Sequence, residues 1–74
     1  MPRKIRDIEG DLRKAGFVEY PRKGKGSHRS FEHPLAPDYP VYIAGHSGDD
    51  ARRYLEKQAA EALRVVAERE KHRR

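Results

Sequence analysis

Apolar residues recur along the first part of the chain at the spacing of an amphipathic helix. Ile5, Ile8, Leu12 and Ala15 follow one another at intervals of three and four residues, which places them on one helical face. Gly16 then supplies a signal for the end of a helix. The pattern therefore predicts a first helix that stops near this glycine.

After the first helix the pattern changes to short runs that are typical of strands. The runs "FVEY" (17–20) and "SHRSFEH" (27–33) predict two strands, and the "PRKGKG" between them predicts a hairpin-like loop. The β-branched and aromatic run "VYIA" (41–44) predicts a third strand. The intervening "PLAPDYP" (34–40) is expected to be a proline-rich connection.

A second helical stripe occupies the C-terminal part of the chain. The segment "GHSGDD" (45–50) is expected to turn into this helix, because Ser47 and Asp50 have the spacing of a capping box. The helix is predicted to run to about residue 70, and "KHRR" (71–74) to form a basic tail. The face predicted to point inward carries Ala51, Tyr54, Leu55, Gln58, Ala59, Ala62, Val65 and Val66.

The predicted elements follow the order α-β-β-β-α in a single domain, residues 1–70. Because the connections are short, both helices are expected on one face of a three-stranded antiparallel sheet, with the other face open to solvent. This α+β arrangement resembles the fold of double-stranded-RNA-binding domains. The residues expected between sheet and helices are Phe17, Phe31, Val41 and Ile43 from the sheet side, opposite Ile8, Leu12, Leu55 and Ala59.

Composition limits the chemistry that such a domain can carry. With 74 residues, of which 35% are hydrophobic and 39% charged, the chain can bury one thin apolar layer and no deep cofactor site. Seventeen Lys and Arg against twelve Asp and Glu give a net charge of +5, which favours RNA, DNA or an acidic protein as partner. The lack of cysteine excludes disulfides and thiolate metal sites.

Two further expectations concern location and cofactors. The N-terminal sequence "MPRKIRD" has no apolar signal region, and no apolar run reaches membrane-spanning length. We therefore expect a cytoplasmic protein that does not contact a membrane. No cofactor and no metal ion is expected.

The positive charge is concentrated beside one histidine. Residues 22–29 hold four Lys or Arg and no acidic residue. Cations in this segment can stabilise the charge on a phosphate, and its glycines let the backbone approach a phosphate closely. The predicted phosphate-binding residues are Lys23, Gly24, Lys25, Gly26, Ser27 and Arg29.

The histidine in this segment is the candidate catalytic residue. Strand alternation places His28 with Ser30 and Glu32, on the face opposite Arg29 and Phe31. Since Phe31 should face the helices, His28 should point to the open face. A histidine can give or take a proton near neutral pH, and cleavage of RNA by its own 2′-hydroxyl needs such a group. All the groups that metal-independent RNA cleavage needs thus lie within one hairpin, with His28 as the candidate proton-transfer residue.

The residue types leave other interpretations open. The same loop can bind phosphate without catalysis, or form only a solvated hairpin turn, and the basic face can dock an acidic partner protein. Another alternative is a zinc site built from His28, His33 and His46, although no cysteine or well-spaced acid supports it. Otherwise His33 is expected at the end of a strand, and His46 where the chain leads into the second helix.

Two segments resemble the HicA family of toxin mRNA interferases. They are "GKGSHRSFEHP" (24–34), which follows a helix ending in "KAGF" (14–17), and "VYIAGHSGDDARRYLEKQAAEAL" (41–63). The resemblance extends from about residue 4 to residue 67. It implies a toxin of a type II toxin–antitoxin system, with the double-stranded-RNA-binding type of fold and messenger RNA as substrate. It also implies that His28 is catalytic and that a HicB antitoxin covers the active face.

The chain departs from the family pattern at two places in this loop. Many family members carry a second histidine directly after the first, where this chain has Arg29. The segment between "GF" and "GSH" is about two residues longer here, with Pro21 inserted. Both differences affect the geometry of the loop, and neither removes His28.

Overall fold

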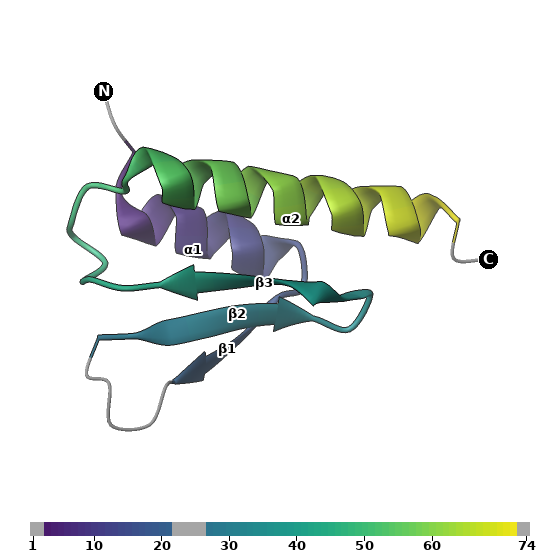
Figure 1. Ribbon diagram of the computed structural model, residues 1–74, viewed down its shortest axis with the longest axis horizontal. Helices are drawn as coiled ribbons and strands as arrows, with labels where there is room; N and C mark the ends of the chain where they lie inside the picture. Colours follow the sequence, from purple (N-terminus) through teal and green to yellow (C-terminus); the bar gives the residue numbers. More distant parts are fainter. Residues whose placement is uncertain (1–2, 22–26, 73–74) are drawn as a thin grey trace.

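The computed structural model describes residues 3–21 and 27–72 and has two helices and three strands within them. These elements are α1 (Ile5–Lys14), β1 (Val18–Pro21), β2 (Arg29–His33), β3 (Ala36–Ile43) and α2 (Arg53–Lys71). The strands form one antiparallel sheet in the order β1-β2-β3, and both helices lie on the same side of it (Figure 1). The predicted α-β-β-β-α fold is confirmed. Its likeness to double-stranded-RNA-binding domains stays a prediction.

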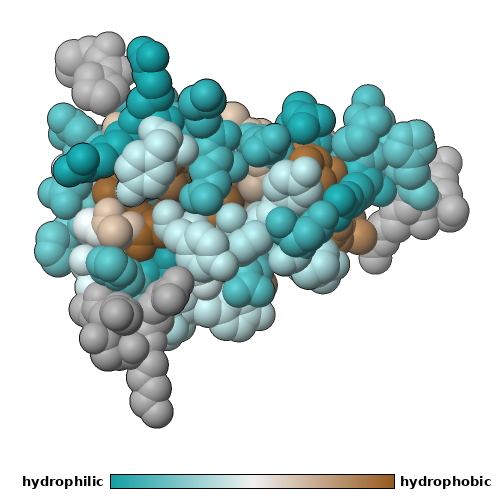
Figure 2. Space-filling view, viewed as in Figure 1, coloured by the Kyte–Doolittle hydropathy of each residue, from teal (hydrophilic) through white to brown (hydrophobic). Residues whose placement is uncertain are grey.

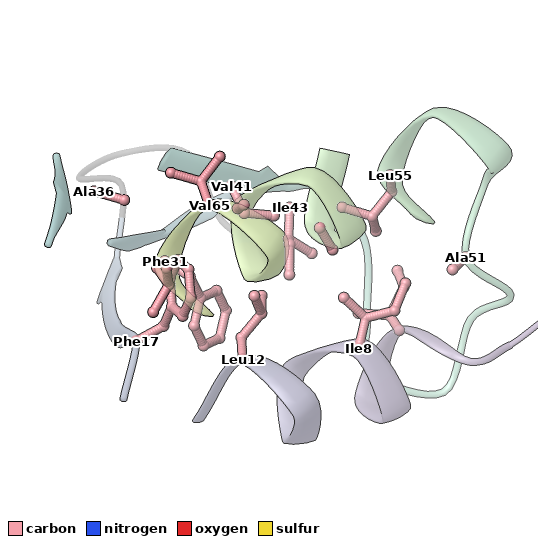
Figure 3. Close-up of a cluster of buried hydrophobic side chains, with 14 residues drawn as sticks. Ile8, Leu12, Phe17, Phe31, Ala36, Val41, Ile43, Ala51, Leu55 and Val65 are labelled. Atoms are coloured by element: carbon pink, nitrogen blue, oxygen red, sulfur yellow. The ribbon is translucent and has the colours of Figure 1, made fainter. Parts of the chain in front are cut away.

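The apolar core lies between the sheet and the two helices, as Figure 3 shows. Leu12 of α1, Phe31 of β2 and Val41 of β3 have 0% of their surface exposed. Burial of each large apolar side chain contributes roughly 1.5–3 kcal/mol. The residues predicted for this layer are all buried: Ile8, Leu12, Phe17, Phe31, Val41, Ile43, Leu55 and Ala59.

The expectation of a proline-rich connection over 34–40 is wrong. Most of this stretch belongs to β3, which runs Ala36–Ile43 in place of the predicted 41–44. Pro37 and Pro40 are tolerated because β3 lies at the edge of the sheet, where a missing backbone N–H need not break a ladder. The register between β2 and β3 also shifts along this stretch. Edge position is a tertiary property, so the prolines alone could not reveal it.

The predicted capping box at the start of α2 is also wrong. The helix begins at Arg53, and its N-cap residue makes no side-chain cap hydrogen bond. The Ser47 hydroxyl donates instead to a Glu9 carboxylate oxygen at 2.8 Å. The Asp50 carboxylate accepts a hydrogen bond from Lys4 Nζ at 2.6 Å. Both polar residues therefore tie the β3–α2 loop to the N-terminal part of the chain.

Tyr54 was expected on the inner face of α2, and this expectation is wrong. Its side chain is exposed, with 60% of its surface accessible, because it lies in the first turn of the helix beside the β3–α2 loop. The molecular face seen in Figure 2 is mostly hydrophilic, with hydrophobic residues visible between the polar ones. The helix buries the rest of the predicted apolar stripe: Leu55, Ala59, Ala62, Val65 and Val66.

The C-terminal part of α2 is fastened to the turn between β2 and β3. Arg69 Nη1 donates to the Leu35 carbonyl at 2.9 Å, and the guanidinium pairs with both Asp38 carboxylate oxygens at 2.8 and 3.0 Å. Hydrogen bonding by Arg69 holds the pKa of Asp38 below its ordinary value. Together these contacts fix the long helix over the edge strand.

Gly16 is the position after α1 where a side chain should be most costly. Its φ is +99°, and a Cβ there would lie 3.0 Å from His33 Nε2. We expect Gly16→Ala to lower the free energy of unfolding by about 1–2 kcal/mol, measured by urea denaturation. Gly10→Ala is the control, since nothing lies within 4 Å of its added Cβ and helix propensity should raise stability by about 1 kcal/mol. Equal shifts in the two variants would contradict this assignment.

Candidate active site

His28 lies directly before β2 and is exposed. The strand was expected to include it, but β2 begins one residue later, at Arg29. Two surface depressions meet at this histidine. A smaller one of about 230 Å³ is also lined by Tyr42, Tyr54 and Gln58. A larger one of about 500 Å³ lies between the end of β1, residues 27–29 and residues 45–47.

The predicted phosphate site includes both described residues and residues outside the described ranges. Lys23, Gly24, Lys25 and Gly26 lie outside the described residues, so their proposed contacts stay predictions. Ser27 is half-buried and lines the larger depression beside His28. The described part of the predicted site therefore consists of three consecutive residues, Ser27 and His28 directly before β2 and Arg29 at its first position.

The Arg29 side chain is engaged in an ion pair and in hydrogen bonds with other parts of the protein. Its side chain is 12% exposed and forms an ion pair with Glu9, which is 3% exposed. Arg29 Nε donates to Glu9 Oε2 at 2.9 Å, and Nη2 donates to the same oxygen. Arg29 Nη1 donates to the carbonyl oxygens of Ser27 and Gly45, the latter at 2.8 Å. These hydrogen bonds give the guanidinium a structural role. Its predicted role as a phosphate ligand stays a prediction.

Glu9 was not among the predicted site residues, although the pattern of apolar positions contains a signal for it. Glu9 occupies the i+4 position of the stripe that begins at Ile5 and continues through Ile8 and Leu12. A carboxylate on the apolar face of a helix is costly to bury unless a cation and hydrogen bonds compensate it. Such a position predicts a buried cationic partner, which the fold supplies as Arg29.

His46 lies in the β3–α2 loop, well before the first residue of α2 at Arg53, so it does not lead directly into the helix as expected. Its backbone N–H donates to Asp49 Oδ2 at 2.9 Å, and its carbonyl accepts from the Asp49 N–H at 2.9 Å. Gly45 precedes it with a φ of +115°, a conformation that favours glycine. His46 is exposed and lines the larger depression together with His28.

His33 has a structural role. It ends β2 as predicted and is buried. The backbone N–H of Leu35 donates to Nδ1 at 3.0 Å, so Nε2 carries the hydrogen and donates to the Ala15 carbonyl at 3.0 Å. With both ring nitrogens engaged, His33 has none to offer a zinc ion. Across residues 3–21 and 27–72, no group of three or more His, Asp, Glu or Cys is arranged to hold a metal.

Two exposed tyrosines lie on the open face of the sheet, and one of them, Tyr42, lines the smaller depression together with His28. The strand register places Tyr20, Ser30 and Tyr42 in one row across β1, β2 and β3. Tyr20 is 50% exposed and Tyr42 is 48% exposed, on either side of the small Ser30. Exposed aromatic rings on a basic protein are suited to stacking on unpaired bases.

Comparison with protein-family models places the chain in one known class of protein, the toxins of bacterial toxin–antitoxin systems. A family model described as HicA toxin of bacterial toxin-antitoxin matches residues 5–65. The chain therefore belongs to the HicA toxin family, which confirms the resemblance stated above. Membership implies an antitoxin partner. Comparisons with curated proteins and with solved structures gave no match.

A helix that crosses a membrane must be both long and predominantly apolar. Neither α1 nor α2, the helices of the described residues, is both long and apolar enough to cross a bilayer.

Proposed function

We propose that this toxin is an endoribonuclease that cleaves messenger RNA without a metal ion and uses His28 to transfer a proton. The observation that carries the proposal is the placement of His28. The imidazole is exposed at the junction of two depressions, and none of the described residues engages it in a hydrogen bond or ion pair. It is thus free to meet a ligand, whereas His33 is committed to the fold.

The proposed reaction is transfer of the phosphodiester to the neighbouring 2′-oxygen. The 2′-hydroxyl loses its proton and its oxygen bonds to phosphorus, while the bond from phosphorus to the 5′-oxygen breaks and that oxygen gains a proton. The products are a 2′,3′-cyclic phosphate and a 5′-hydroxyl, so no water is consumed. An imidazole can serve either proton transfer, and cations of the basic loop, Lys23 and Lys25, would stabilise charge on the phosphate oxygens.

A HicB-type antitoxin is the proposed protein partner, and the cytoplasm, where messenger RNA is translated, is the proposed location. Covering the open face that holds His28 would block access to RNA. The net charge of +5 makes an acidic contact surface on that partner favourable.

A non-catalytic RNA-binding module is the second candidate. The exposed row of Tyr20 and Tyr42 favours it, because stacking and phosphate contacts give affinity for single strands without any chemistry. The two candidates differ in whether the RNA is broken.

A cleavage assay with purified protein tests the proposal. We expect the chain to cut single-stranded RNA in buffer containing EDTA and to leave 2′,3′-cyclic phosphate and 5′-hydroxyl ends, resolved by end-labelling and gel electrophoresis. A deoxyribose substitution at the mapped cleavage site is the matched control and should block cutting there, because it removes the attacking oxygen. Intact RNA that is nevertheless bound would leave the binding module as the function.

A further inference from the structure

We propose that His46 is the second proton-transfer group of the reaction and works with His28 across the larger depression. This inference rests on the proposed ribonuclease function and deepens it. His46 lies outside the "GSH" motif, in the second of the two segments that resemble the family, and the family match over residues 5–65 assigns it no role. The fold brings the two histidines to the walls of one depression.

The chemistry requires two proton transfers at different oxygens. One group removes the proton of the 2′-hydroxyl, and another protonates the departing 5′-oxygen on the opposite side of the phosphorus. A single imidazole cannot hold and lack the proton in the same step, so two groups with opposite protonation states are favoured. Histidine suits both tasks because it changes charge near neutral pH.

The depression offers groups of the right kind on separate walls. Glu19 and Pro21 at the end of β1 form one part of it, residues 27–29 another, and residues 45–47 of the β3–α2 loop the third. Its volume of about 500 Å³ and open shape suit a segment of chain passing through rather than an enclosed small molecule. His28 and His46 are its exposed histidines.

The buried ion pair holds the backbone on both sides of each histidine. Arg29 is the residue after His28, and its guanidinium donates to the carbonyl of Ser27, the residue before His28. The same guanidinium donates to the carbonyl of Gly45, the residue before His46.

The residue after His46 is anchored to the same pair, because the Ser47 hydroxyl donates to Glu9 Oε1 at 2.8 Å. The two exposed imidazoles thus extend from backbone segments that are fixed to one buried pair, Arg29 with Glu9. This arrangement pre-organises two side chains that lie far apart in the sequence.

The charged groups around the depression are compatible with this assignment. Glu19 Oε1 accepts from Arg13 Nη2 at 2.6 Å, and Glu19 Oε2 lies 3.7 Å from Arg29 Nε. Asp49 accepts from the backbone of His46. The carboxylates of the described residues near the depression therefore already have partners, which leaves the two imidazoles as the groups of those residues available for proton transfer.

The test compares His46→Ala, His28→Ala and the control His72→Ala on one RNA oligonucleotide cleaved at a mapped site. His72 lies at the end of α2, exposed and 3.6 Å from Glu68, away from the depression. We expect His46→Ala to lower the single-turnover rate by about 100-fold or more, with unchanged RNA affinity and circular dichroism. His72→Ala should behave as the wild type.

A second substrate identifies the two roles. An oligonucleotide with a bridging sulfur in place of the 5′-oxygen has a leaving group that needs no protonation. One of the two variants, His28→Ala or His46→Ala, should recover most of its rate on this substrate, and the other should not. The pH–rate profile of the wild type should be bell-shaped, and each variant should lose one limb of it.

The outcomes separate this inference from the proposed function. Wild-type protein that does not cleave RNA overturns both. Cleavage lost in His28→Ala but normal in His46→Ala overturns only the two-histidine assignment. A slow His46→Ala with weaker RNA binding, no rescue of either variant by the sulfur substrate and an unchanged pH profile would make His46 a binding residue and also overturn it.

Discussion

His28→Ala should lower the rate of RNA cleavage by about 10²–10⁴-fold, the range that general acid–base catalysis typically supplies. The free energy of unfolding should change by less than about 0.5 kcal/mol, because the side chain is exposed and the described residues form no hydrogen bond with its ring. RNA affinity should stay close to that of the wild type. The measurements are single-turnover cleavage, urea denaturation and RNA binding by fluorescence anisotropy.

Growth after induction gives the same prediction a readout in cells. Wild-type protein should arrest growth, and His28→Ala should not, while both accumulate to the same level. His33→Ala is an informative comparison, since this buried histidine links Ala15 and Leu35 and its loss should act through stability. Cleavage by purified His28→Ala at the wild-type rate would refute the catalytic role and favour the RNA-binding module.

The sequence was most informative where a pattern reports directly on burial. The stripe from Ile5 to Leu12 and the apolar runs around Phe31 and Val41 predicted the helix, the strands and the packed layer, because periodicity and burial express the same physical constraint. The alternation along β2 also placed Arg29 and Phe31 on the inner face of the sheet, where the structure has them.

The errors arose where a residue's role depends on long-range contacts. Pro37 and Pro40 suggested a loop, but they lie in a strand at the edge of the sheet. Ser47 has the spacing of a helix cap, yet its hydroxyl bonds to Glu9, which is distant in sequence. The nearness of His46 to His28 follows from the same long-range contacts, so no local motif could have shown it.

Removing one partner of the Glu9–Arg29 ion pair should cost more stability than breaking any other ion pair of the described residues, because both side chains are buried or nearly so. Glu9→Gln removes the charge that compensates a guanidinium whose side chain is only 12% exposed. Breaking such a buried pair typically costs about 3–5 kcal/mol, because the remaining charge stays buried without a partner. We therefore expect Glu9→Gln to lower the free energy of unfolding by about that amount in urea denaturation.

Asp50→Asn is the matched control, because it also replaces a carboxylate by its amide. Asp50 pairs with Lys4 at 2.6 Å, but the two side chains are 58% and 42% exposed. Exposed pairs contribute about 0–1 kcal/mol, so this variant should unfold nearly as the wild type does. If the free energy of unfolding fell equally in the two variants, burial would not determine the cost of losing an ion pair.

A double variant separates the stability of the pair from its positioning of the histidines. Replacing a buried ion pair by apolar residues of similar size is often neutral for stability, so Glu9→Leu with Arg29→Met should be more stable than Glu9→Gln. Its cleavage rate should nevertheless stay low, because the Ser27 and Gly45 carbonyls lose their common donor and the Ser47 hydroxyl loses its acceptor. We expect the loss in kcat with KM little changed, since misplaced imidazoles slow the chemical step. A stable double variant that cleaves RNA at the wild-type rate would show that the pair supports the fold without positioning His28 and His46.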